Sequence, residues 1–255
     1  MIKWKMVPQL MGKGKVINCL LSVLLLLPAW ASGNEQKADV EATIIHFSEF
    51  ELGSGVYPVS LTITADFLRI DDTDEGKDFV LFNRKTNEIY SVNSEQQQII
   101  QIKQTPVTIK SPMELKLHES ELAMDDNAPL IAGKKARHYQ FFVNDKLCYD
   151  LISVPDLMPD AVMALKTFKQ VLAGQQSETL RSVPGDLHEG CELARHVFYP
   201  QRYLEKGFPI IEKEPGQADD TKDKINYSRT LINFKDEKVS SDRFVLPDYQ
   251  VIPIN

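Results

Sequence analysis

The richest group of chemically active side chains lies between His188 and His196, in the run His-Glu-Gly-Cys-Glu-Leu-Ala-Arg-His. On a helix, the two histidines and either Cys191 or Glu192 could share one face and bind zinc. The run is not the metalloprotease motif His-Glu-x-x-His, because its fifth position is Glu192. A cysteine held in a disulfide could not act as a thiolate ligand. The run therefore predicts a solvated helix surface, with a zinc site as the alternative.

A second acidic run covers residues 71–76, Asp-Asp-Thr-Asp-Glu-Gly, and resembles a calcium loop at first reading. The helix-loop-helix calcium site requires a bidentate glutamate at loop position 12. Counting from Asp71, that position is Phe82. The run is therefore predicted to be a turn between strands, and no metal site is expected in it.

The sequence contains no recognisable set of residues for nucleophilic catalysis. There is no Gly-x-Ser-x-Gly motif, and His46, His118 and His138 lie in strand-like segments without a recognisable partner. A general base needs a nucleophile and an orienting acid close to it in space. We therefore expect a protein that is not an enzyme and has no cofactor, with a hydrolase or metal enzyme as the remaining alternative.

The first 31 residues have the pattern of a secretory signal peptide. Four lysines precede an apolar stretch at 16–27, and Ala29-Trp30-Ala31 is a small-x-small cleavage site. An uncleaved anchor and a lipoprotein modified at Cys19 are the alternatives. Removing residues 1–31 lowers the number of Lys and Arg from 29 to 25 against 36 Asp and Glu. This acidic balance argues against nucleic acid as a partner, and the cleaved protein is expected to be periplasmic without stable membrane insertion.

Cys148 and Cys191 are the two cysteines that remain after the leader. Export places them in an oxidising compartment, and they do not form a Cys-x-x-Cys pair. They are predicted to form one structural disulfide between a strand and a helical segment.

Hydrophobic periodicity predicts many strands and one main helix. The expected strands cover residues 40–52, 57–70 (as one long strand or two short ones), 78–83, 88–93, 98–103, 136–143, 147–154, 207–213, 227–234 and 244–252, with weaker strand patterns at 108–109 and 114–118. Residues 119–133 are expected to be a long loop, and 214–226 an acidic mobile loop. Helical spacing covers 160–173, with Gly174 as the expected stop. The predicted fold is mainly β with α (α+β): residues 32–255 form one domain, in which a curved antiparallel sheet, or unclosed β-barrel, is plugged by the helix.

This order of elements resembles the LolA-like periplasmic half-barrels and related exported domains. The matching pieces are Phe-Leu-Arg-Ile at 67–70, Asn-Glu-Ile-Tyr-Ser-Val at 87–92, Gly-Phe-Pro-Ile at 207–210 and Phe-Val-Leu-Pro-Asp-Tyr at 244–249. The resemblance implies an unclosed barrel whose hydrophobic cavity holds acyl chains, and an arginine, here Arg69, that helps to govern a lid. The cysteine pair and the acidic 214–226 loop depart from the family pattern.

Aromatic and aliphatic residues of the strands and the helix, together with one arginine, are the candidate ligand-binding set. They are Phe67, Arg69, Phe79, Leu81, Tyr90, Phe141, Leu165 and Phe168. Ordinary core packing is the alternative interpretation of this set. The sequence thus leads to the hypothesis of a periplasmic binding protein that holds an apolar ligand, the acyl chain of a lipid or lipoprotein, between sheet and helix. The alternative is an envelope protein-protein interaction module with a filled core.

Overall fold

The computed structural model describes residues 38–72, 77–125, 127–180, 182–184, 188–216 and 225–254. All of them belong to one compact unit, Lys37–Asn255. The signal peptide predicted over residues 1–31 lies outside the described residues, as do most of the acidic run at 71–76 and most of the loop predicted at 214–226.

Twelve strands form one sheet in the order β12-β6-β5-β4-β3-β2-β1-β11-β10-β9-β8-β7. Neighbouring strands are antiparallel except β12 and β6, which are parallel. The strands are β1 (Asp39–Glu51), β2 (Gly55–Ile63), β3 (Phe67–Asp71), β4 (Phe79–Asn83), β5 (Glu88–Asn93), β6 (Gln98–Lys103), β7 (Leu117–Leu122), β8 (Arg137–Val143), β9 (Lys146–Val154), β10 (Phe208–Pro215), β11 (Ile225–Ser240) and β12 (Gln250–Ile254).

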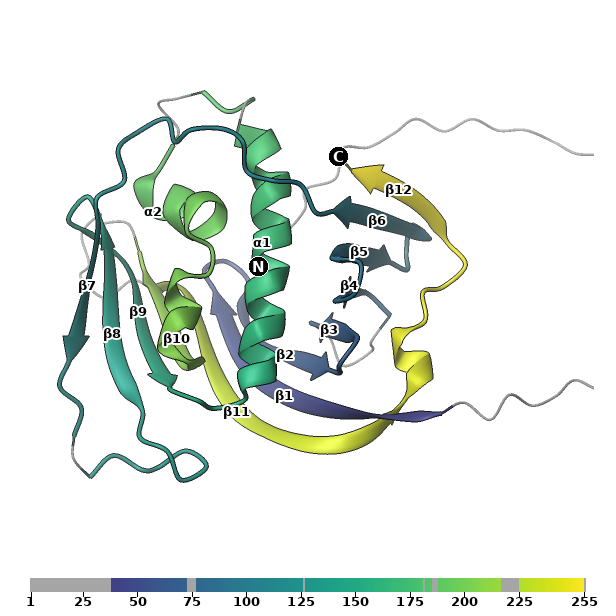
Figure 1. Ribbon diagram of the computed structural model, residues 1–255, viewed down its shortest axis with the longest axis horizontal. Helices are drawn as coiled ribbons and strands as arrows, with labels where there is room; N and C mark the ends of the chain where they lie inside the picture. Colours follow the sequence, from purple (N-terminus) through teal and green to yellow (C-terminus); the bar gives the residue numbers. More distant parts are fainter. Residues whose placement is uncertain are drawn as a thin grey trace, which may run out of the picture. The chain divides into compact units, whose positions relative to one another are not determined.

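The sheet curves around one long helix, α1 (Pro159–Leu180), which lies inside the curve (Figure 1). The short helices α2 (Gly190–Leu193), η2 (Ala194–Phe198) and η3 (Arg202–Lys206) connect α1 to β10, and η4 (Ser241–Phe244) precedes β12. The prediction of a mainly β fold with an open, curved sheet and an inserted helix is confirmed.

Helix α1 does not stop at Gly174 but continues through it to Leu180. The glycine has a different reason: a Cβ at this position would collide with the backbone carbonyl oxygen of Thr105. The missing side chain therefore allows the segment after β6 to pass close to the helix. The sequence pattern alone could not distinguish this close approach from a helix end.

Residues 119–133, predicted as a loop, begin with most of β7. The strand has few apolar residues because it lies at the edge of the sheet, where its side chains are largely exposed. The weak strand pattern at 114–118 overlaps only the first two residues of β7, whose position is defined by backbone pairing to β8.

The predicted disulfide between Cys148 and Cys191 is present, with Cα atoms 5.3 Å apart. It joins β9 to α2 and so fastens the helical connection to the sheet.

Both faces of the sheet carry a hydrophobic core. The larger core lies between the sheet and α1 and includes Phe82, Phe141 and Phe168. The smaller one lies on the opposite face of β1 and β4–β6 and includes Phe244, from the segment that leads to β12. The C-terminal segment thus covers one face of the sheet while α1 covers the other. Among the described residues, no helix has the length and apolar character needed to cross a membrane.

Candidate functional site

The eight residues predicted to line one apolar lumen lie in two different places. Phe141, Leu165 and Phe168 belong to the core between the sheet and α1. Phe67, Phe79, Leu81 and Tyr90 belong to the core under the C-terminal segment, and Arg69 joins them there through Phe79. Alternation along β3 explains the division, because Leu68 faces α1 while Phe67 and Arg69 face the other way.

Arg69 fastens the C-terminal segment to the sheet. Its guanidinium donates to Asp71 at 2.7 Å and to the backbone carbonyl of Arg243 at 2.6 Å, and lies 3.7 Å from the centroid of the Phe79 ring. Arg69 and Asp71 are 8% and 6% exposed. In this arrangement Arg69 has a structural role, since its donors bind the protein's own main chain and carboxylate.

The space between α1 and the centre of the sheet is filled by side chains. The Phe168 ring meets the Phe82 ring edge-on with centroids 5.8 Å apart, and Phe141 stacks on Tyr149 at 4.6 Å. Phe82 and Phe141 are fully buried. Here the aromatic residues pack against one another as an ordinary core.

A cluster of charged residues occupies the same face of the sheet near β1, β10 and β11. Arg195, from η2, binds Glu212 and Glu214, and its guanidinium lies 5.3–5.9 Å from the centroids of three tyrosine rings. Arg229 donates to Glu49 at 2.7 Å. Glu49, Glu212 and Arg195 are 0%, 1% and 8% exposed. The tyrosines are Tyr149, Tyr203 and Tyr227.

Burial and neighbouring charges have opposite effects on the pKa of Glu212 in this cluster. Burial alone would raise the pKa of Glu212, but Arg195, Arg229 and Lys169 outweigh it and hold that pKa below its ordinary value. Lys169, on α1, is partly buried beside Arg195, and these two effects lower its pKa to about 8. We call Glu49, Lys169, Arg195, Glu212, Glu214 and Arg229 the ionic cluster. Its charges make this end of the α1 face unsuitable for an acyl chain.

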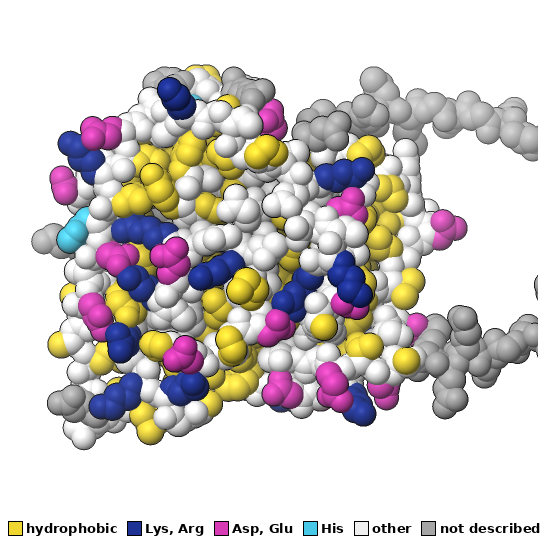
Figure 2. Space-filling model, viewed as in Figure 1, with side chains coloured by type: hydrophobic (Ala, Val, Ile, Leu, Met, Phe, Trp, Pro, Cys, Tyr) yellow, Lys and Arg dark blue, Asp and Glu magenta, His cyan; other side chains and the backbone are white. Residues whose placement is uncertain are grey.

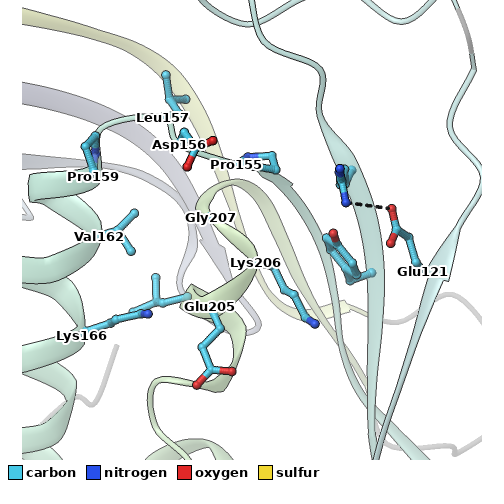
Figure 3. A pocket seen from close by; sticks show the side chains of 13 residues that line it. Glu121, Pro155, Asp156, Leu157, Pro159, Val162, Lys166, Glu205, Lys206 and Gly207 are labelled. Carbon is cyan, nitrogen blue, oxygen red and sulfur yellow. Dashed lines mark ion pairs between the residues drawn. The ribbon is translucent and has the colours of Figure 1, made fainter.

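An open pocket of about 550 Å³ lies between α1 and the β7–β8 margin of the sheet (Figure 3). Its apolar lining comes from β8, the β9–α1 connection, α1 and η3. These residues are Tyr139, Pro155, Leu157, Pro159, Val162 and Leu204. Gly207 also lines it, with φ of 110° and no room for a Cβ beside the Val154 carbonyl, so the chain turns closely there.

Charged side chains of both signs surround this apolar lining. Arg137 lies 3.8 Å from Glu121, and Lys206 binds Glu119 while lying over the Tyr139 ring. Lys166 extends from α1 beside the pocket (Figure 3).

Lys166 differs from the other two basic residues of the pocket. Within the described ranges its ammonium group has no hydrogen bond or ion pair, although the side chain is partly buried. The carboxylates of Asp156 and Glu205, which also line the pocket, are exposed to solvent. The pocket therefore offers one cation that has no carboxylate partner among the described residues, next to an apolar surface.

The zinc alternative at 188–196 finds no support in the geometry. Cys191 is in the disulfide, and the Nε2 atom of His196 lies 3.3 Å from a carboxylate oxygen of Glu192, one helical turn away. In the part of the chain that the structure describes, no three His, Cys, Asp or Glu side chains are grouped so that they could hold a metal ion.

Sequence reasoning did not find the pocket or the ionic cluster. The charged members of the cluster come from α1, η2 and the three strands β1, β10 and β11, and each looks like an ordinary polar residue in its own segment. A useful signal was present in β10, where Glu212 and Glu214 alternate with Ile211 and Lys213 and so point to one face. The pocket has no such signal, because its walls meet only after folding.

Comparison with known proteins does not assign this chain to a family. No family model and no curated protein sequence matches it. Two solved structures, of PNGF-II in the C2 and P21 space groups, are similar with a TM-score of 0.39 and identities of 11% and 10%. Each alignment covers 84% of this chain and 31% or 32% of the other, so the chain spans about a third of that protein's length.

Proposed function

We propose that this protein is a non-catalytic binding protein whose site is the pocket between α1 and the β7–β8 margin. The observation that carries the proposal is the coincidence of an apolar lining with the partly buried side chain of Lys166, whose ammonium has no partner among the described residues. A ligand with an apolar chain and an acidic head would bury methylene groups on the lining and place its oxygens near Lys166. The acyl chain of a lipid or lipoprotein belongs to this class.

This proposal places the ligand in the pocket at the side of α1 instead of in the space between α1 and the centre of the sheet. Aromatic side chains fill the space between α1 and the centre of the sheet. The ionic cluster occupies the same face near β1, β10 and β11. The disulfide supports a location in an oxidising compartment, such as the periplasm that the leader pattern predicts.

Amphiphiles of defined chain and head provide a direct test. Decanoate and dodecanoate should both bind to the purified mature protein, and each additional methylene that reaches the lining should tighten Kd about fourfold, since burial contributes about 0.8 kcal/mol per CH₂. Dodecyltrimethylammonium has the same chain with a cationic head and should bind more weakly. Replacing Lys166 by glutamine should reduce this preference for the acidic head.

Two tryptophan variants on one helix separate the pocket from the rest of α1. Val162→Trp places a large ring in the pocket and should abolish dodecanoate binding in native mass spectra. Met163→Trp is the control, because Met163 is 60% exposed and does not line the pocket. Equal retention of dodecanoate by both folded variants, or no retention by the native chain, would refute the proposal.

A further inference from the structure

Six charged side chains line the pocket between α1 and the β7–β8 margin, three of each sign. Half of them interact within the protein: a guanidinium nitrogen of Arg137 lies 3.8 Å from a carboxylate oxygen of Glu121, and Lys206 binds Glu119. The charged groups of the other three have no ion pair or hydrogen bond among the described residues. These three are Asp156, Lys166 and Glu205.

The three unpaired side chains come from segments that meet at this pocket. Asp156 lies in the connection from β9 to α1, Lys166 lies on α1 and Glu205 on η3 (Figure 3). Lys166 is partly buried, whereas Asp156 and Glu205 are exposed. One cation and two carboxylates therefore border the same apolar lining and are available to a ligand.

A head group of a single sign cannot use all three of these charges. An anionic head would be attracted by Lys166 but would approach the carboxylates of Asp156 and Glu205, and a cationic head would meet the reverse. A head that carries both signs can place its acidic oxygens near Lys166 and its cation near the two carboxylates. The charges left unpaired in the protein thus match a head group with no net charge.

We propose that the ligand of this pocket is a zwitterionic amphiphile, in which an apolar chain carries an acidic group such as a phosphodiester, followed by an ammonium. This inference rests on the proposed function, because the chain occupies the same apolar lining, and it adds that Asp156 and Glu205 recognise the ammonium. Since both carboxylates are exposed, each should change Kd by no more than about fivefold.

Two lysophospholipids that share a dodecanoyl chain and a phosphodiester provide a matched pair of probes. Lysophosphatidylethanolamine ends in an ammonium, and lysophosphatidylglycerol ends in uncharged hydroxyl groups. In calorimetric titration of the purified protein, at low salt and below the micellar concentrations, the ethanolamine lipid should bind about three- to tenfold more tightly. If both bind equally, or the glycerol lipid binds more tightly, this inference is overturned and the apolar pocket stands. If neither binds, the proposed function fails as well.

The head group without its chain separates a lipid from a free zwitterion. Glycerophosphoethanolamine carries the same phosphodiester and ammonium but has no acyl chain, so it should show no binding in the concentration range that saturates the lipid. If it bound as tightly as the lipid, the apolar lining would not contribute and an amphiphilic ligand would be refuted.

Neutral variants of the two carboxylates test whether they recognise the ammonium. Asparagine suits the backbone of Asp156, whose φ is 58°, and glutamine has the shape of Glu205. Asp156→Asn alone should reduce the preference for the ethanolamine lipid, and Asp156→Asn/Glu205→Gln should abolish it. The control is Asp145→Asn, at another exposed aspartate with positive φ, 63°, that does not line the pocket. A double variant that keeps the preference, or a control that loses it, overturns the inference.

Lys166→Gln completes the set, because both lysophospholipids carry the phosphodiester that this residue is expected to attract. The variant should weaken both lipids and leave the ethanolamine lipid the tighter of the two. Val162→Trp, which places a large ring in the pocket, should abolish the binding of both. If the ethanolamine lipid still bound to folded Val162→Trp, the head group would be recognised elsewhere, which would contradict the assignment to Asp156 and Glu205.

Discussion

Replacing Arg195 by methionine tests whether the ionic cluster holds η2 against the sheet. The substitution keeps an unbranched apolar stem but removes the guanidinium, and so leaves Glu212, which is 1% exposed, without its main cation. Removing one partner of a buried ion pair costs about 3–5 kcal/mol of unfolding free energy. For a domain of this size, each kcal/mol lowers Tm by about 2–4 °C, so the expected fall is roughly 6–20 °C.

Urea unfolding gives the free energy of unfolding and thermal unfolding gives Tm, both followed by circular dichroism with the disulfide kept oxidised. The double variant Arg195→Met/Glu212→Leu should recover much of the loss, because no unpaired carboxylate remains at the buried position. Lys85→Met is the control: its ion pair with Asp66 has side chains 70% and 43% exposed, and its loss should cost under about 1 kcal/mol.

The pH dependence gives an independent check of the cause. In the native chain the pKa of Glu212 is lowered, so its ionised form contributes stability above the ordinary carboxyl pKa, and this contribution is lost as the pH falls through the lowered value. Without Arg195, burial should raise that pKa and reverse the effect. The stability gap between native and Arg195→Met proteins should therefore narrow from pH 7 toward pH 4. The reasoning would be refuted if Arg195→Met lowered the unfolding free energy by less than about 1 kcal/mol. It would also be refuted if the loss in the double variant equalled the sum of the losses in the two single variants.

Two further predictions concern residues that fasten or strain the same region. Replacing both Cys148 and Cys191 by serine should cost about 4 kcal/mol in the chain-entropy model for a separation of 43 residues, measured by urea unfolding; an unchanged midpoint would contradict it. Lys169→Met should raise stability at pH 7, because the lowered pKa of Lys169 means that the unfolded chain binds more protons between about pH 8 and its ordinary pKa. Native stability should accordingly rise with pH in that window, and the variant should lose this slope.

Local patterns in the sequence were sufficient for much of the fold. The strands at 88–93 and 98–103 coincide with β5 and β6, because alternation and short turns are properties of neighbouring residues. The disulfide was predictable as well, since only two cysteines follow the expected leader. Gly174 shows where such reasoning ends: whether a glycine stops a helix or admits a neighbouring backbone depends on a contact from a distant segment.

The candidate sites depended far more on tertiary structure. Phe67 and Phe168 are both aromatic residues at regular spacing, yet they belong to cores on opposite faces of the sheet. The sequence shows that a strand has two apolar faces, but not that α1 covers one and the C-terminal segment the other. By itself the sequence determined the kinds of elements, their order and the cysteine pair, which follow from local periodicity and composition. Only the tertiary structure decided that Arg69 binds the C-terminal segment, that charges meet around Arg195, and that a pocket opens beside Lys166, because each of these unites side chains from segments far apart in the chain.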